Sequence, residues 1–96
     1  MKESEQAIFR ARENVVATDI DGGQVLLDLD NGQYFSLNGT ASIVWQGISE
    51  SKNRAEIVQQ ILRLYDIDEE RCGHDVSAII EALCSSNLVE EVRENS

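Results

Sequence analysis

The sequence predicts an α+β fold in which a three-stranded antiparallel sheet is followed by three helices. Two turn signals, Asp21-Gly22-Gly23-Gln24 and Asp30-Asn31-Gly32, separate three short runs rich in strand-forming residues. After Asn38 the apolar residues recur at helical rather than alternating spacing. The chain has no proline, internal repeat or low-complexity linker. One continuous domain therefore accommodates the whole pattern.

The second turn predicts a β-hairpin over residues 26–38. If Asn31 and Gly32 formed a two-residue loop, each face of the hairpin would mix polar and apolar residues. A three-residue loop with Gly32 at the bulge position separates them better. We therefore expect one buried face formed by the pairs Leu29–Gln33, Leu27–Phe35 and Val25–Leu37. The solvent-facing set is Asp28, Asp30, Tyr34 and Ser36.

The first turn independently favours the same buried face. A strand over residues 15–20, joined by a Gly22-Gly23 loop, would place its alternate residues opposite those of the hairpin. The expected partners are Ile20, Thr18 and Val16 with Val25, Leu27 and Leu29. Two separately analysed turns thus indicate one buried surface. The result is a meander whose third strand, residues 33–37, lies at the edge of the sheet.

Three helices are expected, each with a signal at its start. These signals are residues that suit an N-cap or the first turn of a helix: Asn38 or Thr40, Asn53 with Glu56, and Asp68 with Glu69 and Glu70. The first helix is short and ends near residues 47–49. The third helix spans residues 68–87, and residues 88–92 are expected to form a last short strand.

Composition limits the size, location and partners of the protein. The 96 residues, 42% of them apolar, suffice for one modest core. We expect a tail at residues 1–13 and a domain at residues 14–93. Neither an apolar run of about 18 residues nor a secretion signal is present, so a soluble, cytoplasmic protein with reduced cysteines is expected.

Charge narrows the choice of partner. The formal net charge of −10 makes nucleic acid and anionic membranes poor partners, because binding to either depends on Lys and Arg. A basic or neutral polypeptide suits the chain better. The alternative is that the acidity serves solubility alone.

A search for catalytic and metal-binding residues favours a protein without enzymatic activity or cofactor. His74 is the only histidine, and its spacing from Cys72 places the two on different sides of a helix. The Asp19/Asp21 and Asp28/Asp30 pairs lack the Gly and Glu positions of a calcium loop. Turn formation and solubility account for them better.

The expected edge strand offers a different kind of site. Residues 33–37 carry no Lys, Pro or bulge of the kind that usually protects a sheet edge, so an extended peptide could add there as a further strand. The third helix could provide an apolar wall, through Ile79 with Leu83 or through Ile80 with Cys84. The alternative is that the helix stripe is entirely core, and that the tail or the last strand covers the edge.

The chain resembles the PqqD-like family in several blocks. The most specific are Val25–Leu29, Gly32–Asn38 and Ile43–Trp45, with weaker matches at Glu56–Val58, Leu64–Asp66, Asp75–Val76 and Leu83–Val89. Members of this family are RiPP recognition elements, winged-helix-like domains that bind the leader segment of a ribosomally made precursor peptide. The residues in these blocks are most similar to those of recognition proteins of lasso-peptide biosynthesis. Such proteins act beside a cysteine-protease-like enzyme that removes the leader.

The resemblance implies that a leader adds antiparallel to the third strand and packs against the third helix. Carried onto this sequence, the expected leader-binding residues are Gln33, Tyr34, Phe35, Ser36, Leu37, Asp75, Val76, Ile79, Ile80 and Leu83. Asp75 and Glu81 are candidates for holding basic leader residues. Which flank of the helix faces the leader stays open at this point.

Two other functions compete with leader binding. One is a structural subunit that docks permanently on a maturation enzyme. The other is a winged-helix DNA-binding protein, since this order of strands and helices occurs in that class. Its recognition helix would carry mostly acidic residues, namely Glu69, Glu70, Asp75 and Glu81 against Arg71 and His74, which is the wrong sign for DNA.

Overall fold

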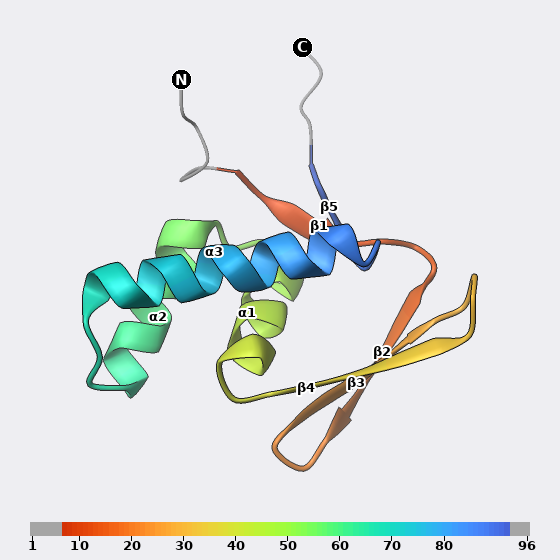
Figure 1. Ribbon diagram of the computed structural model, residues 1–96, viewed down its shortest axis with the longest axis horizontal. Coiled ribbons are helices and arrows are strands. Elements are labelled where there is room, and N and C mark those ends of the chain that lie inside the picture. Colours follow the sequence, from red (N-terminus) through yellow and green to blue (C-terminus); the bar gives the residue numbers. More distant parts are fainter. Residues whose placement is uncertain (1–6, 93–96) are drawn as a thin grey trace.

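The computed structural model describes residues 7–92, which form two small antiparallel sheets and three helices (Figure 1). The elements are β1 (Phe9–Ala11), β2 (Val15–Ile20), β3 (Gly23–Asp28), β4 (Gln33–Asn38), α1 (Gly39–Ser49), α2 (Arg54–Leu64), α3 (Glu69–Ser85) and β5 (Val89–Glu91). One sheet has the order β2-β3-β4, and the other pairs β1 with β5. The expected α+β fold, with its meander followed by three helices, is confirmed. Residues 1–6 of the expected tail and residue 93 of the expected domain lie outside the described residues.

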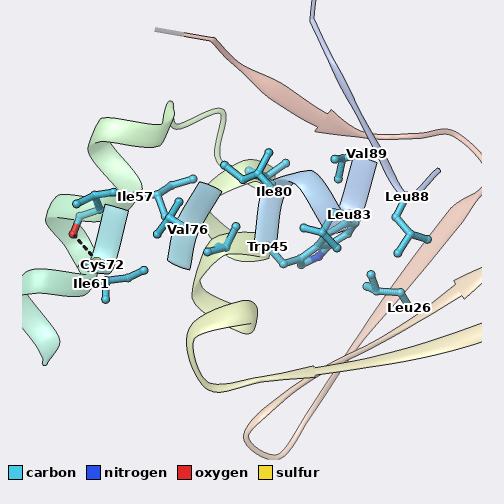
Figure 2. Close-up of a cluster of buried hydrophobic side chains, with 13 residues drawn as sticks. Leu26, Trp45, Ile57, Ile61, Cys72, Val76, Ile80, Leu83, Leu88 and Val89 are labelled. Carbon is cyan, nitrogen blue, oxygen red and sulfur yellow. Dashed lines mark hydrogen bonds between the residues drawn. The ribbon is translucent and has the colours of Figure 1, made fainter. Parts of the chain in front are cut away.

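The β3–β4 hairpin has a different register from the expected one. Leu26 pairs with Phe35 and Asp28 pairs with Gln33, across a four-residue loop rather than a three-residue one. The expected pairs Leu27–Phe35, Val25–Leu37 and Leu29–Gln33 are therefore wrong by one position. The side chain that enters the core from the middle of β3 is Leu26, which is fully buried (Figure 2).

A buried carboxylate explains this register. Asp28, which was expected to face solvent, is almost completely buried and holds the loop together. Its side chain accepts hydrogen bonds from the Asn14 amide at 2.8 Å and from the Asp30 backbone N–H at 3.0 Å. Its carbonyl accepts a further bond from the Gly32 N–H at 2.7 Å. Because these bonds satisfy the polar groups of Asp28, the residue can occupy the inner face.

The β2–β3 turn is also displaced from its expected position. The loop consists of Asp21 and Gly22, the latter at φ +89°, so that Ile20 pairs with Gly23. The predicted Gly22-Gly23 loop is wrong, and Val16 pairs with Leu27 rather than with Leu29. Together the two registers reverse the faces of β2 and β3, so that Val16, Val25 and Leu27 lie on the outer face instead of the buried one. In β4 the faces are as expected, with Phe35 and Leu37 directed inward and the exposed Tyr34 and Ser36 outward.

Gly23 allows β3 and β4 to approach closely at the end of the sheet. A Cβ atom built on Gly23 would overlap with the Leu37 carbonyl oxygen. We expect Gly23→Ala to separate the strands there and to lower the free energy of unfolding by about 1–3 kcal/mol, as overpacking does. Denaturant titration measures the change. Gly32→Asn is the control, because nothing lies near a Cβ on Gly32 and Asn tolerates its φ of +73°. Equal stability of Gly23→Ala and the wild type would contradict the expectation.

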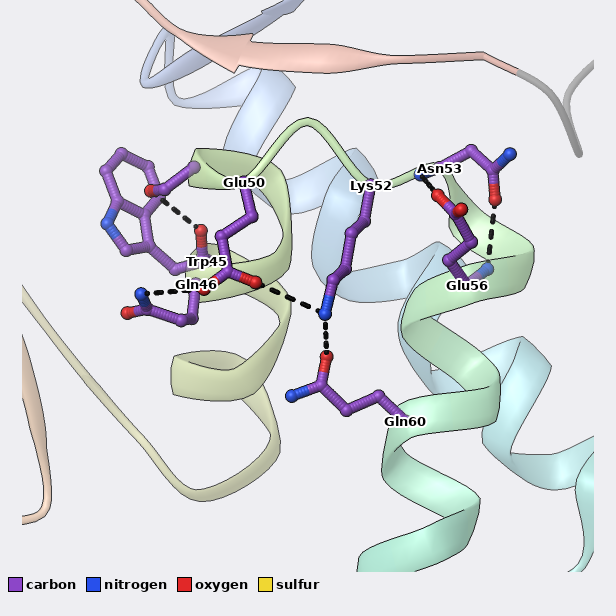
Figure 3. Close-up of polar contacts among 8 residues, drawn as sticks. Trp45, Gln46, Glu50, Lys52, Asn53, Glu56 and Gln60 are labelled. Atoms are coloured by element: carbon purple, nitrogen blue, oxygen red, sulfur yellow. Dashed lines mark hydrogen bonds and ion pairs between the residues drawn. The ribbon is translucent and has the colours of Figure 1, made fainter.

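The three helices begin and end close to their expected positions. Asn38 is the N-cap of α1, although its side chain makes no cap bond. Asn53 and Glu56 form the expected capping box, through the bonds Glu56 N–H to Asn53 Oδ1 and Asn53 N–H to Glu56 Oε1 (Figure 3). The Asp68 carboxylate caps α3 by accepting from the Arg71 N–H. These local bonds explain why the helix starts were predictable from sequence.

A single apolar core joins the helices to the sheet. Its fully or nearly fully buried members come from β3, all three helices and the segment after α3: Leu26, Val44, Trp45, Ile48, Ile57, Val58, Ile61, Cys72, Val76, Ile80, Leu83, Leu88 and Val89. Trp45 lies within this core, as expected from its place on an apolar helix face. Figure 2 shows Leu26 on the sheet side of the cluster, next to Leu83 and Leu88.

The second sheet ties together the two ends of the described chain. Val89–Glu91 forms the expected last strand and pairs with β1, which lies within the segment expected to be a tail. Arg10 and Arg12 both contact the Glu90 carboxylate, at 2.8 and 3.1 Å. These two strands were the candidates for covering the edge of the larger sheet. They pair with each other instead.

Candidate functional site

Strand β4 is the terminal strand of its sheet, and no other strand among residues 7–92 pairs with its outer side. The backbone hydrogen bonds show which residues face outward. Leu29 N–H donates to the Asn14 carbonyl at 2.7 Å, so the polar backbone groups of Leu29 point toward the β2 side. The Asp28 carbonyl accepts from the Gly32 N–H and therefore points toward the β4 side. Since successive residues of an antiparallel strand alternate in direction, even-numbered residues of β3 bond to β4.

This alternation fixes the polar groups at the edge. Leu26 pairs with Phe35 and Gln24 with Leu37, so the N–H and C=O groups of Phe35 and Leu37 are used within the sheet. Those of Tyr34 and Ser36 point away from it. The edge thus presents alternate donors and acceptors at the spacing that an added strand requires.

Partly buried apolar side chains of β4 and α3 pack against the core. Phe35 and Leu37 of β4 pack against the core without being completely covered, as does Ile79 of α3. Phe35 shares the inner face with Leu26, its partner in β3, and Leu26 lies next to Leu83 (Figure 2). Ile79 is one helical turn before Leu83 and therefore lies on the same face of α3. We refer to Phe35, Leu37 and Ile79 as the apolar strip.

The structure distinguishes among the predicted residues of α3. Val76, Ile80 and Leu83 are buried in the core, and Asp75 and Ile79 remain accessible. Ile80 and Cys84 line a cavity of about 310 Å³ together with Phe9 of β1 and Arg54 of α2. That flank of the helix therefore faces β1 and α2, and the Ile79 flank is the one directed away from them.

Two acidic residues that were grouped in the sequence lie apart in the structure. Asp75 precedes Ile79 by one turn and is exposed on the same flank. Glu81 lines the cavity next to Phe9 and Arg54, on the other flank. The expectation that both carboxylates hold basic residues of one peptide is therefore not supported by their positions. Of the two, Asp75 is the residue that shares a flank of α3 with Ile79.

The remaining reactive groups are structural or isolated. Burial raises the pKa of both the Cys72 and the Cys84 thiol, which lowers their thiolate fraction and hence their reactivity. The Cys72 Sγ is directed at the Val58 carbonyl oxygen, 3.9 Å away. His74 is exposed on the helix surface. Within residues 7–92, no three His, Cys, Asp or Glu side chains are grouped so as to hold a metal ion.

Residues 23–89 match the family model described as coenzyme PQQ synthesis protein D (PqqD). The chain belongs to the PqqD family. The matched residues of this PqqD-family chain include all of β3, β4 and the three helices. The resemblance seen in the sequence is thereby confirmed. A search of curated proteins found no match.

Two solved structures resemble the PqqD-family chain over most of its length. One is TbiB1 in complex with the TbiA(beta) leader peptide, at 32% identity and a TM-score of 0.82, with 88% of this chain and 99% of that chain covered. The other is lasso peptide synthetase B1 complexed with the leader peptide, at 27% identity and a TM-score of 0.80, with 85% and 96% covered. Both similar proteins were thus solved with a leader peptide bound.

Two features of the site could not be predicted from the sequence, namely the direction of the backbone groups of β4 and the burial of individual residues of α3. The outward direction of the Tyr34 and Ser36 backbone depends on the strand register, which the turn residues did not reveal. The burial of Val76, Ile80 and Leu83 depends on where α2 and β1 lie against α3. The accessible position Ile79 does have a sequence signal, because it lies at one margin of the apolar stripe of the helix.

No helix in the described part of the chain is long and apolar enough to span a membrane.

Proposed function

We propose that this chain is a recognition module that binds the leader segment of a ribosomally made precursor peptide, of the lasso class. The single observation that carries the proposal is the unpaired outer edge of β4. It is supported by the two similar structures, each of which is a complex with a leader peptide. The leader adds as a strand to β4, and its inward side chains contact the apolar strip.

The energetics require both parts of the site. Each backbone hydrogen bond contributes about 0.5–1.5 kcal/mol net, so the few bonds available at Tyr34 and Ser36 give only weak binding. Contacts with Phe35, Leu37 and Ile79 supply further affinity and select the side chains of the leader. Basic leader residues are favoured near Asp75, because the chain carries a formal charge of −10.

In this proposal the module itself catalyses no reaction. It acts in the cytoplasm and presents the bound precursor to a separate cysteine-protease-like enzyme that removes the leader. Its reactive groups suit this role, since burial raises the pKa of both cysteine thiols and the histidine is isolated on the surface. The four acidic residues on α3 make this helix unsuited to binding DNA, because they repel the phosphate backbone.

Amide hydrogen exchange tests the proposed binding mode. A synthetic leader, taken from the precursor encoded beside this chain, is added to the ¹⁵N-labelled protein. We expect exchange to slow at Tyr34 and Ser36, whose N–H groups gain partners, and to change little at Phe35 and Leu37, whose N–H groups are already bonded within the sheet. Calorimetric titration gives the affinity in parallel.

Two outcomes would contradict the proposal. A calorimetric titration without heat or saturation would show that this leader does not bind. Saturable binding that leaves exchange at Tyr34 and Ser36 unchanged would show that the leader binds elsewhere than at the edge of β4. Duplex DNA serves as the competing ligand, and tight salt-sensitive binding to it would favour the winged-helix alternative.

A further inference from the structure

Strand β2 is the other terminal strand of the larger sheet, and its outer edge is unpaired within residues 7–92 (Figure 1). All six of its residues pair one-to-one with β3, so the strand contains no bulge. It also contains no Lys or Pro. Among the described elements, β3 is the only one that packs extensively against β2. An edge of this kind is a template on which another strand can pair.

The backbone hydrogen bonds show which groups of β2 face outward. Odd-numbered residues of β3 bond to β2, and each pairs with an even-numbered residue of β2. The backbone groups of Val15, Ala17 and Asp19 therefore point away from the sheet. The Val15 N–H is already used, because it donates to the Arg12 carbonyl at 3.1 Å. Ala17 and Asp19 thus each offer one outward donor and one outward acceptor.

These two residues are complementary to the same residues of a second copy. When two β2 strands run antiparallel about a two-fold axis at Thr18, Ala17 of each copy lies opposite Asp19 of the other. The two residues of each pair can then exchange N–H···O=C bonds. The same register places Val16 opposite Ile20 on the outer face of the sheet. These β-branched side chains are 45% and 49% exposed, and such cross-strand pairs stabilise antiparallel sheets.

We infer that the outer edge of β2 pairs with the same edge of a second copy of this chain. The product is a continuous sheet with three strands from each molecule. A two-fold axis at Ala17 fits less well, because Asp19 would then lie opposite Val15, whose N–H is already used. Strand β4 lies at both ends of the joined sheet, so dimerisation leaves both leader-binding edges open. The inference goes beyond the proposed function and does not depend on it.

Charge opposes this pairing and predicts how it responds to salt. Each copy has a formal charge of −10, and the two Asp19 carboxylates lie diagonally across the two-fold axis. Because salt screens this repulsion, the dimer should strengthen as ionic strength rises. Each copy contributes one strand of six residues, so we expect less buried surface than the roughly 1,200 Å² of a stable, specific interface. The dimer should therefore be weak and depend on concentration.

Sedimentation velocity of the full chain, over a hundredfold range of concentration, tests the inference. Ala17→Pro removes the outward N–H and obstructs the second strand, whereas Ala17→Ser keeps the N–H and is its control. Asp19→Asn removes the diagonal repulsion. Asp66→Asn makes the same change of charge at an exposed position outside the sheet and is its control. Circular dichroism and thermal unfolding confirm that the variants are folded.

The wild-type chain should pass from monomer to dimer as its concentration rises, with or without the synthetic leader. Ala17→Pro should raise the dissociation constant of the dimer by about tenfold or more, and Ala17→Ser should leave it unchanged. Asp19→Asn should lower it about two- to fivefold relative to Asp66→Asn, as removal of a like-charge pair does. Amide exchange at Ala17 and Asp19 should slow at high protein concentration.

Each contrary result has a definite meaning. A chain that stays monomeric up to about 1 mM would overturn the inference and leave leader binding intact. A dimer that weakens as salt rises, or that Ala17→Pro leaves unchanged, would be joined through another surface. If Ala17→Pro does not fold, equal dimerisation of Asp19→Asn and Asp66→Asn would likewise overturn the inference.

The leader gives the remaining outcomes. A wild-type dimer that the leader dissociates would be joined through β4 rather than β2, which would overturn the inference and support the proposed function. Exchange that slows at Ala17 and Asp19 only when the leader is added, and not at Tyr34 and Ser36, would make β2 the leader-binding edge. That result would overturn the inference and the proposed binding mode together.

Discussion

Replacing Ser36 by proline is expected to weaken leader binding by about tenfold or more while leaving the domain folded. Proline removes the outward N–H of Ser36, which is worth about 0.5–1.5 kcal/mol as a hydrogen bond, and its ring obstructs the approach of the added strand. The fold should tolerate the change, because proline is accepted on an edge strand where the N–H faces solvent. Calorimetric titration with the synthetic leader measures the loss.

The control for this variant is Ser36→Ala, which removes the hydroxyl and keeps the backbone N–H. Its leader affinity should be close to that of the wild type. If Ser36→Pro also bound with wild-type affinity, addition of the peptide to β4 would be excluded. Equal losses in both variants would instead assign the contact to the side chain of Ser36.

The second large effect is expected at Leu83. Leu83→Asp places a carboxylate among Leu26, Leu88 and the other core residues, where no partner for it is available among the described core side chains. Loss of the apolar contacts and burial of the carboxyl group should together cost about 3–5 kcal/mol of stability. This is a large share of the total for a small domain, so thermal unfolding should shift strongly downward or the chain should not fold.

Ile79→Asp separates stability from binding at the same helix face. Ile79 is only partly buried, so its replacement keeps contact with water and should retain most of the stability. It should nevertheless weaken leader binding, because it puts a charge in the apolar strip. Ala78→Asp, at an exposed neighbouring position, is the control for charge alone. A folded Ile79→Asp variant with unchanged leader affinity would remove α3 from the site.

Local signals in the sequence predicted the elements well and the register of the strands poorly. The capping box at Asn53 and Glu56 is a short-range pattern whose partners are three residues apart, so it could be recognised directly. The hairpin register depends instead on Asp28, whose carboxylate binds Asn14, fourteen residues earlier in the chain. Solvent-facing placement is the reasonable expectation for an aspartate, and it fails here because the loop supplies hydrogen-bond donors.

The same error explains what could be predicted of the site. Residues 33–37 were correctly expected at the sheet edge, since the order of strands in a meander follows the order in the chain. The reversal in β2 and β3 moved Val16, Val25 and Leu27, which had been expected in the core, to the outer face of the sheet, whereas the inward side chains of β4 were predicted correctly. The burial of Ile80 and Val76 required knowledge of how α2 and β1 pack against α3, which no local pattern of the sequence contains.

The pairing of β1 with β5 has a practical consequence for handling the protein. The Val92 N–H donates to the Ile8 carbonyl at 2.8 Å, so the described chain enters and leaves the fold at adjacent points. In Figure 1 these points lie on the opposite side of α3 from β4. Surface attachment or a fused fluorescent reporter at either end would therefore leave the strand-accepting side facing open solution.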